Sequence, residues 1–263
     1  MCIRDRVYTL RGYQIPEASR QAKGTAIINL LQLSPGERIT AVINTMEFTE
    51  GQYLFMATNK GTVKRTKLTE FASVRKNGLR AIVLNDNEEL ISVKLTHGNS
   101  NILMATRGGM AIHFSEQDVR VMGRVAHGVR GINLNVQDAV VAMDAIYDLE
   151  SEVLTVTENG SGKRTKLSEY TKQIRGGKGR INYKLTEKTG LVAGMTIVKP
   201  NDELYIITAS GIIIRTNVDE LSTISRNTQG VKAISLNEGD VVTAIATVEA
   251  EENVVKDTET VSE

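Results

Sequence analysis

Apolar and polar residues follow one pattern that returns four times along the chain. In each copy a short apolar run reaches a glycine, and a second run with β-branched and basic residues follows it. The copies are YLFMATNKGTVKRTKLTEF (53–71), ILMATRGGMAIHFSEQDV (102–119), VLTVTENGSGKRTKLSEY (153–170) and LYIITASGIIIRTNVDEL (204–221). Their glycines, Gly61, Gly109, Gly160 and Gly211, are separated by 48, 51 and 51 residues. Short alternating runs of this kind predict β-strands, and no long run has helical periodicity.

Each copy continues through a glycine loop into two more short strands, such as KAISL (232–236) and VVTAIATV (241–248). A unit of about four strands in about 50 residues, repeated at a fixed interval, is typical of a ring of blades. We therefore expect an all-β, propeller-like ring over residues 1–248. The five visible repeats are 1–50, 51–98, 99–149, 150–200 and 201–248. A pair of β-sandwiches is the alternative, which KRTKL disfavours because it occurs twice at the same place in the repeat.

The first repeat departs from the pattern at its start. MCIRDR stands where the first apolar strand should finish, and Asp5 occupies the place of the glycine. We expect an incomplete first blade. Either the natural chain extends upstream, or residues 1–6 are not native to it.

A basic glycine loop recurs in every repeat. The five loops are SRQAKGTAI (19–27), VRKNGLRAI (74–82), GRVAHGVRGI (123–132), IRGGKGRI (174–181) and SRNTQGVKAI (225–234). An arginine precedes the loop glycine by four residues at Arg20, Arg124, Arg175 and Arg226, and by three at Arg75. Further bases in these loops are Lys23, Lys76, Arg80, Arg130, Lys178, Arg180 and Lys232.

A second basic position lies four residues after the strand glycine. It holds Arg65, His113, Arg164 and Arg215, and Lys64 and Lys163 stand beside it in two repeats. Charge on an ordinary solvated face has no reason to keep phase with a repeat. Equivalent positions in a ring recur along one rim, so we expect these bases to form a curved cationic band that binds a polyanion.

The charge distribution supports this expectation. The net charge is +1, yet residues 249–263 hold six acids and one base, which leaves +6 on residues 1–248. The acidic tail lacks aromatic residues and periodicity, and we expect it to be disordered. Aromatic residues make up only 4% of the chain and there is no Trp. Stacking on single-stranded bases is therefore disfavoured, and duplex DNA held by its phosphates is favoured.

Other chemistry finds little support in the sequence. Cys2 is the only cysteine, so no internal disulfide forms, and no apolar run approaches the roughly 18 residues of a membrane span. With no secretory signal, we expect a cytoplasmic protein. GSGKRT (160–165) lacks the first glycine and the Ser or Thr of a phosphate-binding P-loop. The three histidines show no metal-ligand spacing, and no catalytic constellation is present.

The chain resembles the C-terminal domain of the A subunit of DNA gyrase, of the type IIA topoisomerase family. The resemblance rests on YQIPEASRQAKGTAIINLL, GERITAVI, FMATNKGTVKRTKLTEF, VRGINL, NGSGKRTKLSEY and SRNTQGVKAISL, spread over residues 7–248. It implies a six-bladed β-pinwheel that wraps duplex DNA around its basic perimeter. It also implies that this part is not catalytic and has no cofactor of its own. ATP and Mg would act elsewhere, in an A2B2 holoenzyme with the gyrase B subunit that introduces negative supercoils.

The family's signature is a seven-residue box of glutamine, two bases, two glycines, a base and a glycine. Residues 173–179 match six of the seven positions, with Gln173, Arg175, Gly176, Gly177, Lys178 and Gly179 in place and Ile174 instead of a base. In the family the principal box belongs to the first blade, upstream of residue 1 here. Whether this copy replaces or supplements it stays open.

Two other functions stay open. The first is the related domain of topoisomerase IV, which binds DNA without wrapping it fully. The second is a propeller that serves as a scaffold for protein interactions.

Overall fold

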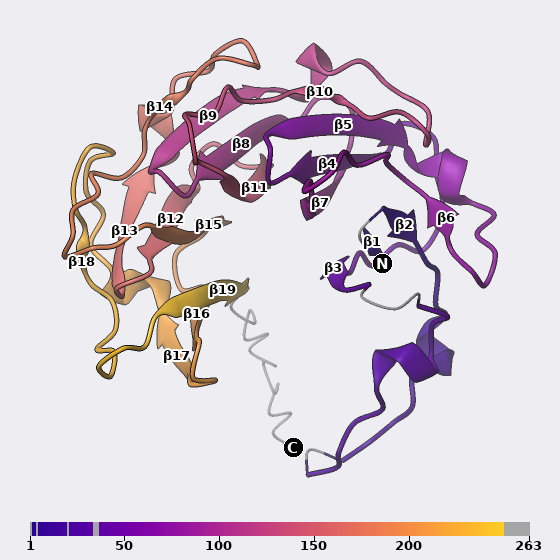
Figure 1. Ribbon diagram of the computed structural model, residues 1–263, viewed down its shortest axis with the longest axis horizontal. Coiled ribbons are helices and arrows are strands. Elements are labelled where there is room, and N and C mark those ends of the chain that lie inside the picture. Colours follow the sequence, from indigo (N-terminus) through magenta and orange to yellow (C-terminus); the bar gives the residue numbers. More distant parts are fainter. Residues whose placement is uncertain (1, 4, 20, 34–36, 250–263) are drawn as a thin grey trace, which may run out of the picture.

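Five small antiparallel β-sheets stand side by side in an open arc (Figure 1). The structure is a computed structural model that describes residues 2–3, 5–19, 21–33 and 37–249. The helices in this part of the chain are single 3-10 turns: η1 (Gly12–Gln14), η2 (Ile27–Asn29), η3 (Leu68–Phe71), η4 (Glu116–Asp118), η5 (Leu167–Glu169) and η6 (Val218–Glu220). Over the described residues, none of these helices has the length and apolarity that crossing a membrane requires.

The sheets are named A to E in chain order, and their strands are given in spatial order. Sheet A contains β3 (Ile39–Ala41), β1 (Cys2–Ile3), β2 (Arg6–Val7) and β6 (Leu79–Arg80). Sheet B contains β10 (Val129–Arg130), β5 (Thr62–Lys67), β4 (Tyr53–Thr58) and β7 (Leu90–Thr96). Sheet C contains β11 (Val140–Ile146), β8 (Asn101–Thr106), β9 (Met110–Ser115) and β14 (Arg180–Ile181). Sheet D contains β15 (Val192–Val198), β12 (Glu152–Thr157), β13 (Ser161–Lys166) and β18 (Val231–Lys232), and sheet E contains β17 (Ile213–Asn217), β16 (Glu203–Thr208) and β19 (Val242–Val248).

The outer strand of each four-stranded sheet comes from the following repeat. In sheet B, for example, Val129 of β10 pairs with Val63 of β5, although the two residues belong to consecutive repeats. The strands β6, β14 and β18 join sheets A, C and D in the same way. Because each repeat completes the sheet before it, the repeats are fastened to one another by backbone hydrogen bonds as well as by packing.

Each pair of neighbouring sheets encloses its own apolar cluster. On β4, Leu54 and Met56 belong to the cluster between sheets A and B, and Phe55 and Ala57 belong to the cluster between sheets B and C. Successive side chains on a strand point to opposite faces, so both faces of β4 are buried. Burial on two sides explains why this run is continuously apolar rather than alternating.

The all-β propeller prediction is confirmed, with two differences. The expected ring is an open arc in this chain, because the first and last sheets do not meet (Figure 1). The incomplete first repeat still forms a sheet, but its strands β1 and β2 have only two residues each. The predicted disordered tail lies outside the described residues except for Glu249.

Candidate nucleic-acid interface

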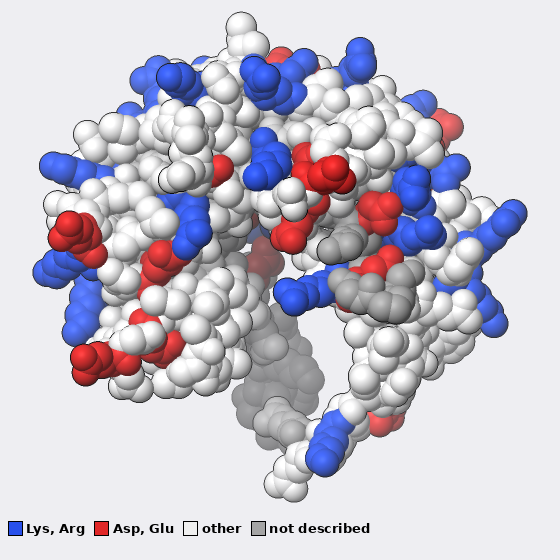
Figure 2. Space-filling view, in the orientation of Figure 1, with Lys and Arg blue, Asp and Glu red and all other residues white. Residues whose placement is uncertain are grey.

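Exposed basic side chains follow the outer strands along the outside of the arc. Each exchanged outer strand presents one exposed base: Arg80 on β6, Arg130 on β10, Arg180 on β14 and Lys232 on β18. The loops that lead into these strands add the exposed side chains of Arg75, Lys76 and Lys178. Figure 2 shows Lys and Arg gathered along the outer margin of the molecule. Of these bases, Arg80 has an ion pair with Asp5 at 3.1 Å.

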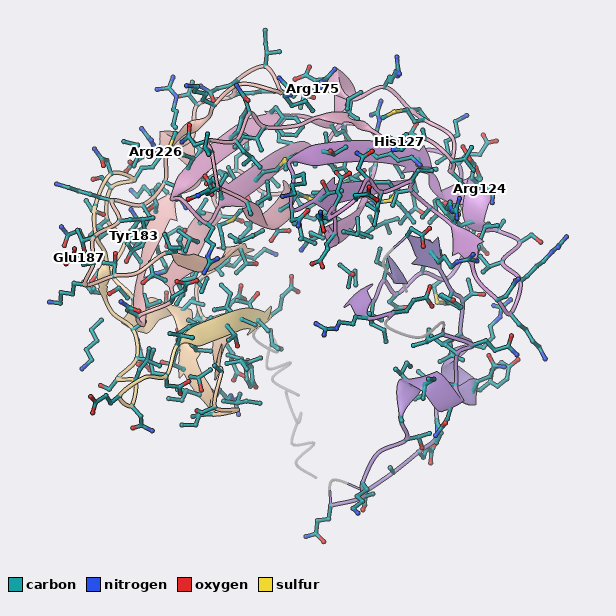
Figure 3. The ribbon with its side chains drawn as sticks, in the orientation of Figure 1. Arg124, His127, Arg175, Tyr183, Glu187 and Arg226 are labelled. Atoms are coloured by element: carbon teal, nitrogen blue, oxygen red, sulfur yellow. The ribbon has the colours of Figure 1, made fainter. Side chains whose placement is uncertain are left out.

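The arginines that precede the loop glycines lie farther in than predicted. Figure 3 shows Arg124, Arg175 and Arg226 one after another along the outside of the arc, and each is half-buried. Arg175 donates from Nε to the Asp118 carbonyl and from Nη1 to the Arg130 carbonyl, both at 2.8 Å. In the next repeat, Arg226 donates from Nη1 to the carbonyl of Ile181. These two arginines therefore fasten their loop to the outer strand before it, although Arg175 retains further donors beyond the two that it uses.

Lys64 and Lys163 are not part of the surface, and the expectation that they add to a cationic band there was wrong. Both side chains are fully buried. The Nζ of Lys64 donates to the carbonyls of Ala81 and Arg124 at 2.6 Å each. The Nζ of Lys163 donates to the carbonyls of Ser225, Arg226 and Thr228. Burial lowers the pKa of each lysine from 10.5 to about 8. Each lysine thus holds the basic loop of the following repeat from its inner side.

The residues at the second basic position, four residues after the strand glycine, also make contacts inside the protein. Arg65 is 9% exposed, lies 4.9 Å from the ring centroid of Tyr53 and forms an ion pair with Glu116 at 3.8 Å. His113 is buried with Nδ1 2.6 Å from the Tyr170 carbonyl, and burial lowers its pKa.

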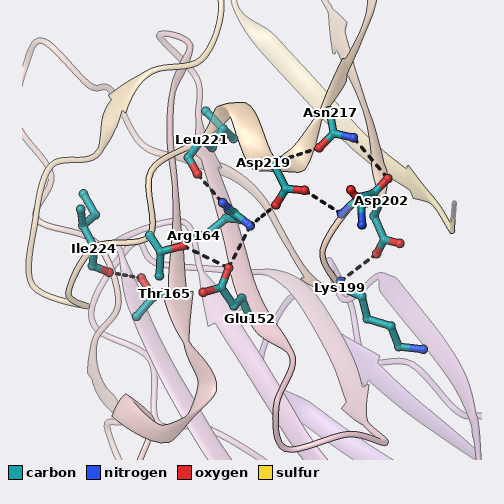
Figure 4. A network of polar contacts seen from close by, with 11 residues as sticks. Glu152, Arg164, Thr165, Lys199, Asp202, Asn217, Asp219, Leu221 and Ile224 are labelled. Carbon is teal, nitrogen blue, oxygen red and sulfur yellow. Dashed lines mark hydrogen bonds and ion pairs between the residues drawn. The ribbon is translucent and has the colours of Figure 1, made fainter.

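The two remaining members of this position also have acidic partners. Arg164 contacts Glu152 and Asp219 and donates to the Leu221 carbonyl at 2.8 Å, as Figure 4 shows. Arg215 is more exposed and pairs with Glu203. The prediction that this position contributes to a surface band was wrong for Arg65, His113 and Arg164, because the acids and carbonyls of neighbouring turns enclose them.

The box-like loop is shaped by contacts with sheet C and its neighbours. The Gln173 N–H donates to the His113 carbonyl at 2.7 Å, and the Gly176 N–H donates to the Gly131 carbonyl at 2.6 Å. Gly179 has a φ of +76°, and a Cβ there would lie 2.4 Å from the Ala111 carbonyl oxygen. Its glycine is thus required by close backbone approach. Gly177 and Lys178 are exposed, so Lys178 is the base of the box that faces solvent.

Two parts of the predicted set lie apart from the rest. Lys23 is exposed in the loop of the first repeat, and the residues of this loop form no strand of a described sheet. Arg20 lies outside the described residues. The prediction omitted several exposed bases, and Arg120, Lys172 and Lys184 are those beside the basic loops. Their positions in or beside the basic loops could have identified them. They were missed because they do not occupy the repeated positions from which the other bases were predicted.

In the described part of the chain, no three His, Cys, Asp or Glu side chains gather closely enough to hold a metal ion. The arrangement offers fixed positive charge on the outside of a curved scaffold. Such charge suits a ligand that is held by its anionic backbone.

Comparison with known proteins gives a family whose model is described as the DNA gyrase C-terminal domain, β-propeller. It matches residues 4–46, 52–97, 100–146, 151–199 and 202–249. The A subunit of DNA gyrase from Clostridium acetobutylicum is 48% identical over 259 residues, which are 98% of this chain and 31% of the relative. The same subunit of Haloquadratum walsbyi is 46% identical over 246 residues (92% and 29%), and that of Escherichia coli is 45% identical over 242 residues (92% and 28%). The chain thus spans less than a third of the length of these relatives.

Two solved structures share the architecture. The C-terminal domain of DNA topoisomerase IV superposes with a TM-score of 0.84 at 26% identity, covering 91% of this chain and 75% of that one. A DNA gyrase A C-terminal domain superposes with a TM-score of 0.80 at 26% identity, covering 93% and 79%. The resemblance drawn from the sequence is confirmed: an arc of strand-exchanged sheets, matched in five successive segments, places this chain in the DNA gyrase C-terminal β-propeller family.

Proposed function

We propose that this domain binds duplex DNA along the outside of the arc and bends it around the sheets. The observation that carries the proposal is the exposed base on each exchanged outer strand, Arg80, Arg130, Arg180 and Lys232. Because the sheets follow one another around the arc, a path along these bases is curved. Phosphate contacts along such a path offset the cost of bending, which is several kcal/mol for roughly a 90° turn.

Within the proposal, the domain has no catalytic residues of its own. It serves a gyrase in which ATP and Mg act elsewhere, in an A2B2 assembly with the gyrase B subunit, and its bent DNA directs ATP-dependent strand passage toward negative supercoiling. Support comes from the identity of 45–48% with proteins named as the A subunit of DNA gyrase. The six-bladed pinwheel belongs to the same proposal, with a further unit standing in the opening between sheets A and E.

The binding surface is tested by removing rim charge without touching internal contacts. The variant Arg130→Ala, Arg180→Ala, Lys232→Ala changes three exposed side chains. Removing one phosphate contact lowers the slope of log K against log salt by about 0.9, so the slope should fall by up to about 2.7, with weaker binding at low salt. Lys199→Ala is the matched control, because this exposed lysine follows β15, on the inner side of sheet D. Equal slopes for the wild type and the triple variant would refute the proposed surface.

Wrapping is tested separately from binding. Nicked circular DNA is sealed by ligase with and without the domain, and the trapped change in linking number is read on a gel. A change that grows with the amount of protein supports wrapping. A second candidate function, DNA binding without full wrapping, is motivated by the similarity to the topoisomerase IV domain. DNA binding with no trapped change in linking number would support this second candidate. Absence of duplex binding even at low salt would instead favour a protein scaffold.

A further inference from the structure

The box-like loop carries an exposed apolar side chain among its basic residues. Ile174 is 83% exposed and belongs to none of the apolar clusters of the described chain. In the other repeats the position five residues before the loop glycine holds a small residue: Ser19, Ser73, Gly123 and Ser225. The fold therefore does not require an apolar side chain there, and Ile174 contributes nothing to the described core.

The chain on both sides of Ile174 is held in place. Before it, the Gln173 N–H donates to the His113 carbonyl at 2.7 Å. After it, the side chain of Arg175 donates to two carbonyls of the preceding repeat at 2.8 Å each. The β-branched side chain of isoleucine also has few rotamers. Ile174 is thus presented in a nearly fixed position, and ordering it against a ligand costs little conformational entropy.

Basic side chains surround this position. Arg175 follows Ile174 directly and lies on the outside of the arc (Figure 3). Arg130 of the outer strand β10 lies beside the same loop, because its carbonyl accepts from Arg175. The exposed Lys178 stands four residues after Ile174. A duplex whose phosphates are held by these bases passes over Ile174.

The chemistry of DNA limits what an isoleucine can contact there. A phosphate gains nothing from an apolar side chain, so the partner of Ile174 is an apolar group inside a groove. The minor groove of B-DNA is about 6 Å wide and does not admit a backbone loop, whereas the major groove is about 12 Å wide and does. The apolar group that DNA bases present in the major groove is the C5 methyl group of thymine.

We propose that Ile174 enters the major groove and packs against the C5 methyl group of thymine. The inference rests on the proposed binding of duplex DNA, and it adds a preference for 5-methyl pyrimidines to a surface that otherwise contacts phosphates. Burying one methyl group changes an affinity by about fourfold. The methyl group carries no charge, so this contact changes the affinity without changing its salt dependence.

Duplexes that contain uracil in place of thymine test the proposal, because uracil pairs with adenine and lacks only the C5 methyl group. The full chain should bind the thymine duplex at least about fourfold more tightly than the uracil duplex, with equal slopes of log K against log salt. Ile174→Ala should bind the two duplexes equally, and Ile174→Val should retain most of the preference. Because Ile174 is so exposed, both variants should keep their fold.

Leu149→Ala is the matched control. Leu149 is 68% exposed in the loop that joins the inner strand β11 to β12, away from the outer strands (Figure 1). This variant removes an exposed apolar side chain of the same size and should show the same preference for thymine as the wild type.

Replacing cytosine by 5-methylcytosine in a G·C duplex provides the converse test. The wild type should gain affinity from the added methyl groups and Ile174→Ala should not. Equal affinity of the wild type for the thymine and uracil duplexes, with a salt slope typical of phosphate contacts, would overturn the inference and leave the proposed DNA binding in place. A preference for thymine that survives in Ile174→Ala would also overturn it, because the preference would then arise elsewhere. A wild type that binds no duplex at low salt would refute both proposals.

Discussion

Replacing Lys163 by methionine separates an internal role of this lysine from a role in binding DNA. The side chain is fully buried, and its Nζ donates to three backbone carbonyls and to the Thr228 hydroxyl at 3.2 Å. The same Nζ lies 4.9 Å from the ring centroid of Tyr183. Methionine retains an unbranched apolar side chain and removes every donor. The substitution therefore deletes the contact that holds the loop of residues 225–228.

The expected loss follows from the groups that are left without partners. A hydrogen bond from a charged donor is worth about 1.5–3 kcal/mol, and a buried acceptor left unsatisfied costs about 1–3 kcal/mol. Removing the charge also removes its own burial cost, which the lowered pKa of about 8 shows to be present. These opposing effects leave a net destabilisation of about 2–4 kcal/mol. For a chain of this size that corresponds to a fall in Tm of roughly 5–15 °C.

The assay combines urea unfolding with a salt titration of DNA binding. Lys163→Met should lower the urea midpoint with little change in the m-value. Below its Tm it should bind DNA more weakly with an unchanged salt slope, because Lys163 contacts no phosphate. Lys166→Met is the control, since Lys166 is exposed on the same strand and should leave stability within about 0.5 kcal/mol. An unchanged midpoint together with a shallower salt slope would refute the internal role, because that pair of results belongs to a direct phosphate contact.

Three further predictions concern other internal contacts. Burial lowers the pKa of Lys64 and Lys163 to about 8, so between about pH 8 and 10.5 the unfolded chain binds more protons than the folded chain and stability rises with pH. After allowance for screening we expect a gain approaching about 1–3 kcal/mol per lysine, measured by urea unfolding from pH 7.5 to 9.5 and absent from the double methionine variant. Gly230→Ala should cost about 3 kcal/mol or more, because φ is +73° and a Cβ would lie 2.7 Å from the Gly162 carbonyl oxygen, whereas Gly24→Ala at the equivalent place meets nothing and should be nearly neutral by thermal melting. Glu116→Gln should cost about 1–3 kcal/mol by the same measurement, because the buried carboxylate accepts from Thr96 and Ser100 at 2.6 Å each and faces Arg65, and an equal Tm would contradict this.

The sequence was sufficient to predict the repeat and the class of fold. The apolar and basic runs on either side of each glycine predicted short strands, and the structure pairs them as antiparallel hairpins at β4–β5, β8–β9, β12–β13 and β16–β17. The partner of the outer strand could not be predicted. Each outer strand has two residues, and every repeat carries the same pattern, so the pattern is equally compatible with pairing inside one repeat or with the previous one. Only packing between repeats decides between these pairings.

The candidate site was predicted with mixed success for a related reason. Lys64 points to the opposite face of its strand from Val63 and Arg65, but the sequence does not show which face of the strand the next repeat covers. One of the two carbonyls that accept from Lys64 belongs to Arg124, 60 residues away, and nothing near Lys64 in the sequence signals it. Arg130 and Lys178 were recognised by their place in glycine loops and are exposed, as a surface role requires.

Basic residues that keep phase with a repeat are therefore not all evidence for a polyanion. An internal cation that holds the next loop can recur at the same place in more than one repeat, because the junction it supports recurs there. Lys64 and Lys163 recur for this reason, and so does the ladder of Arg175 and Arg226 across the outer strands. What distinguishes the residues on the outer strands is that Arg130, Arg180 and Lys232 keep phase and are exposed. Repeated bases that contact buried carbonyls or acids hold neighbouring repeats together. Repeated bases that remain exposed have no such internal role, and a bound polyanion accounts for them.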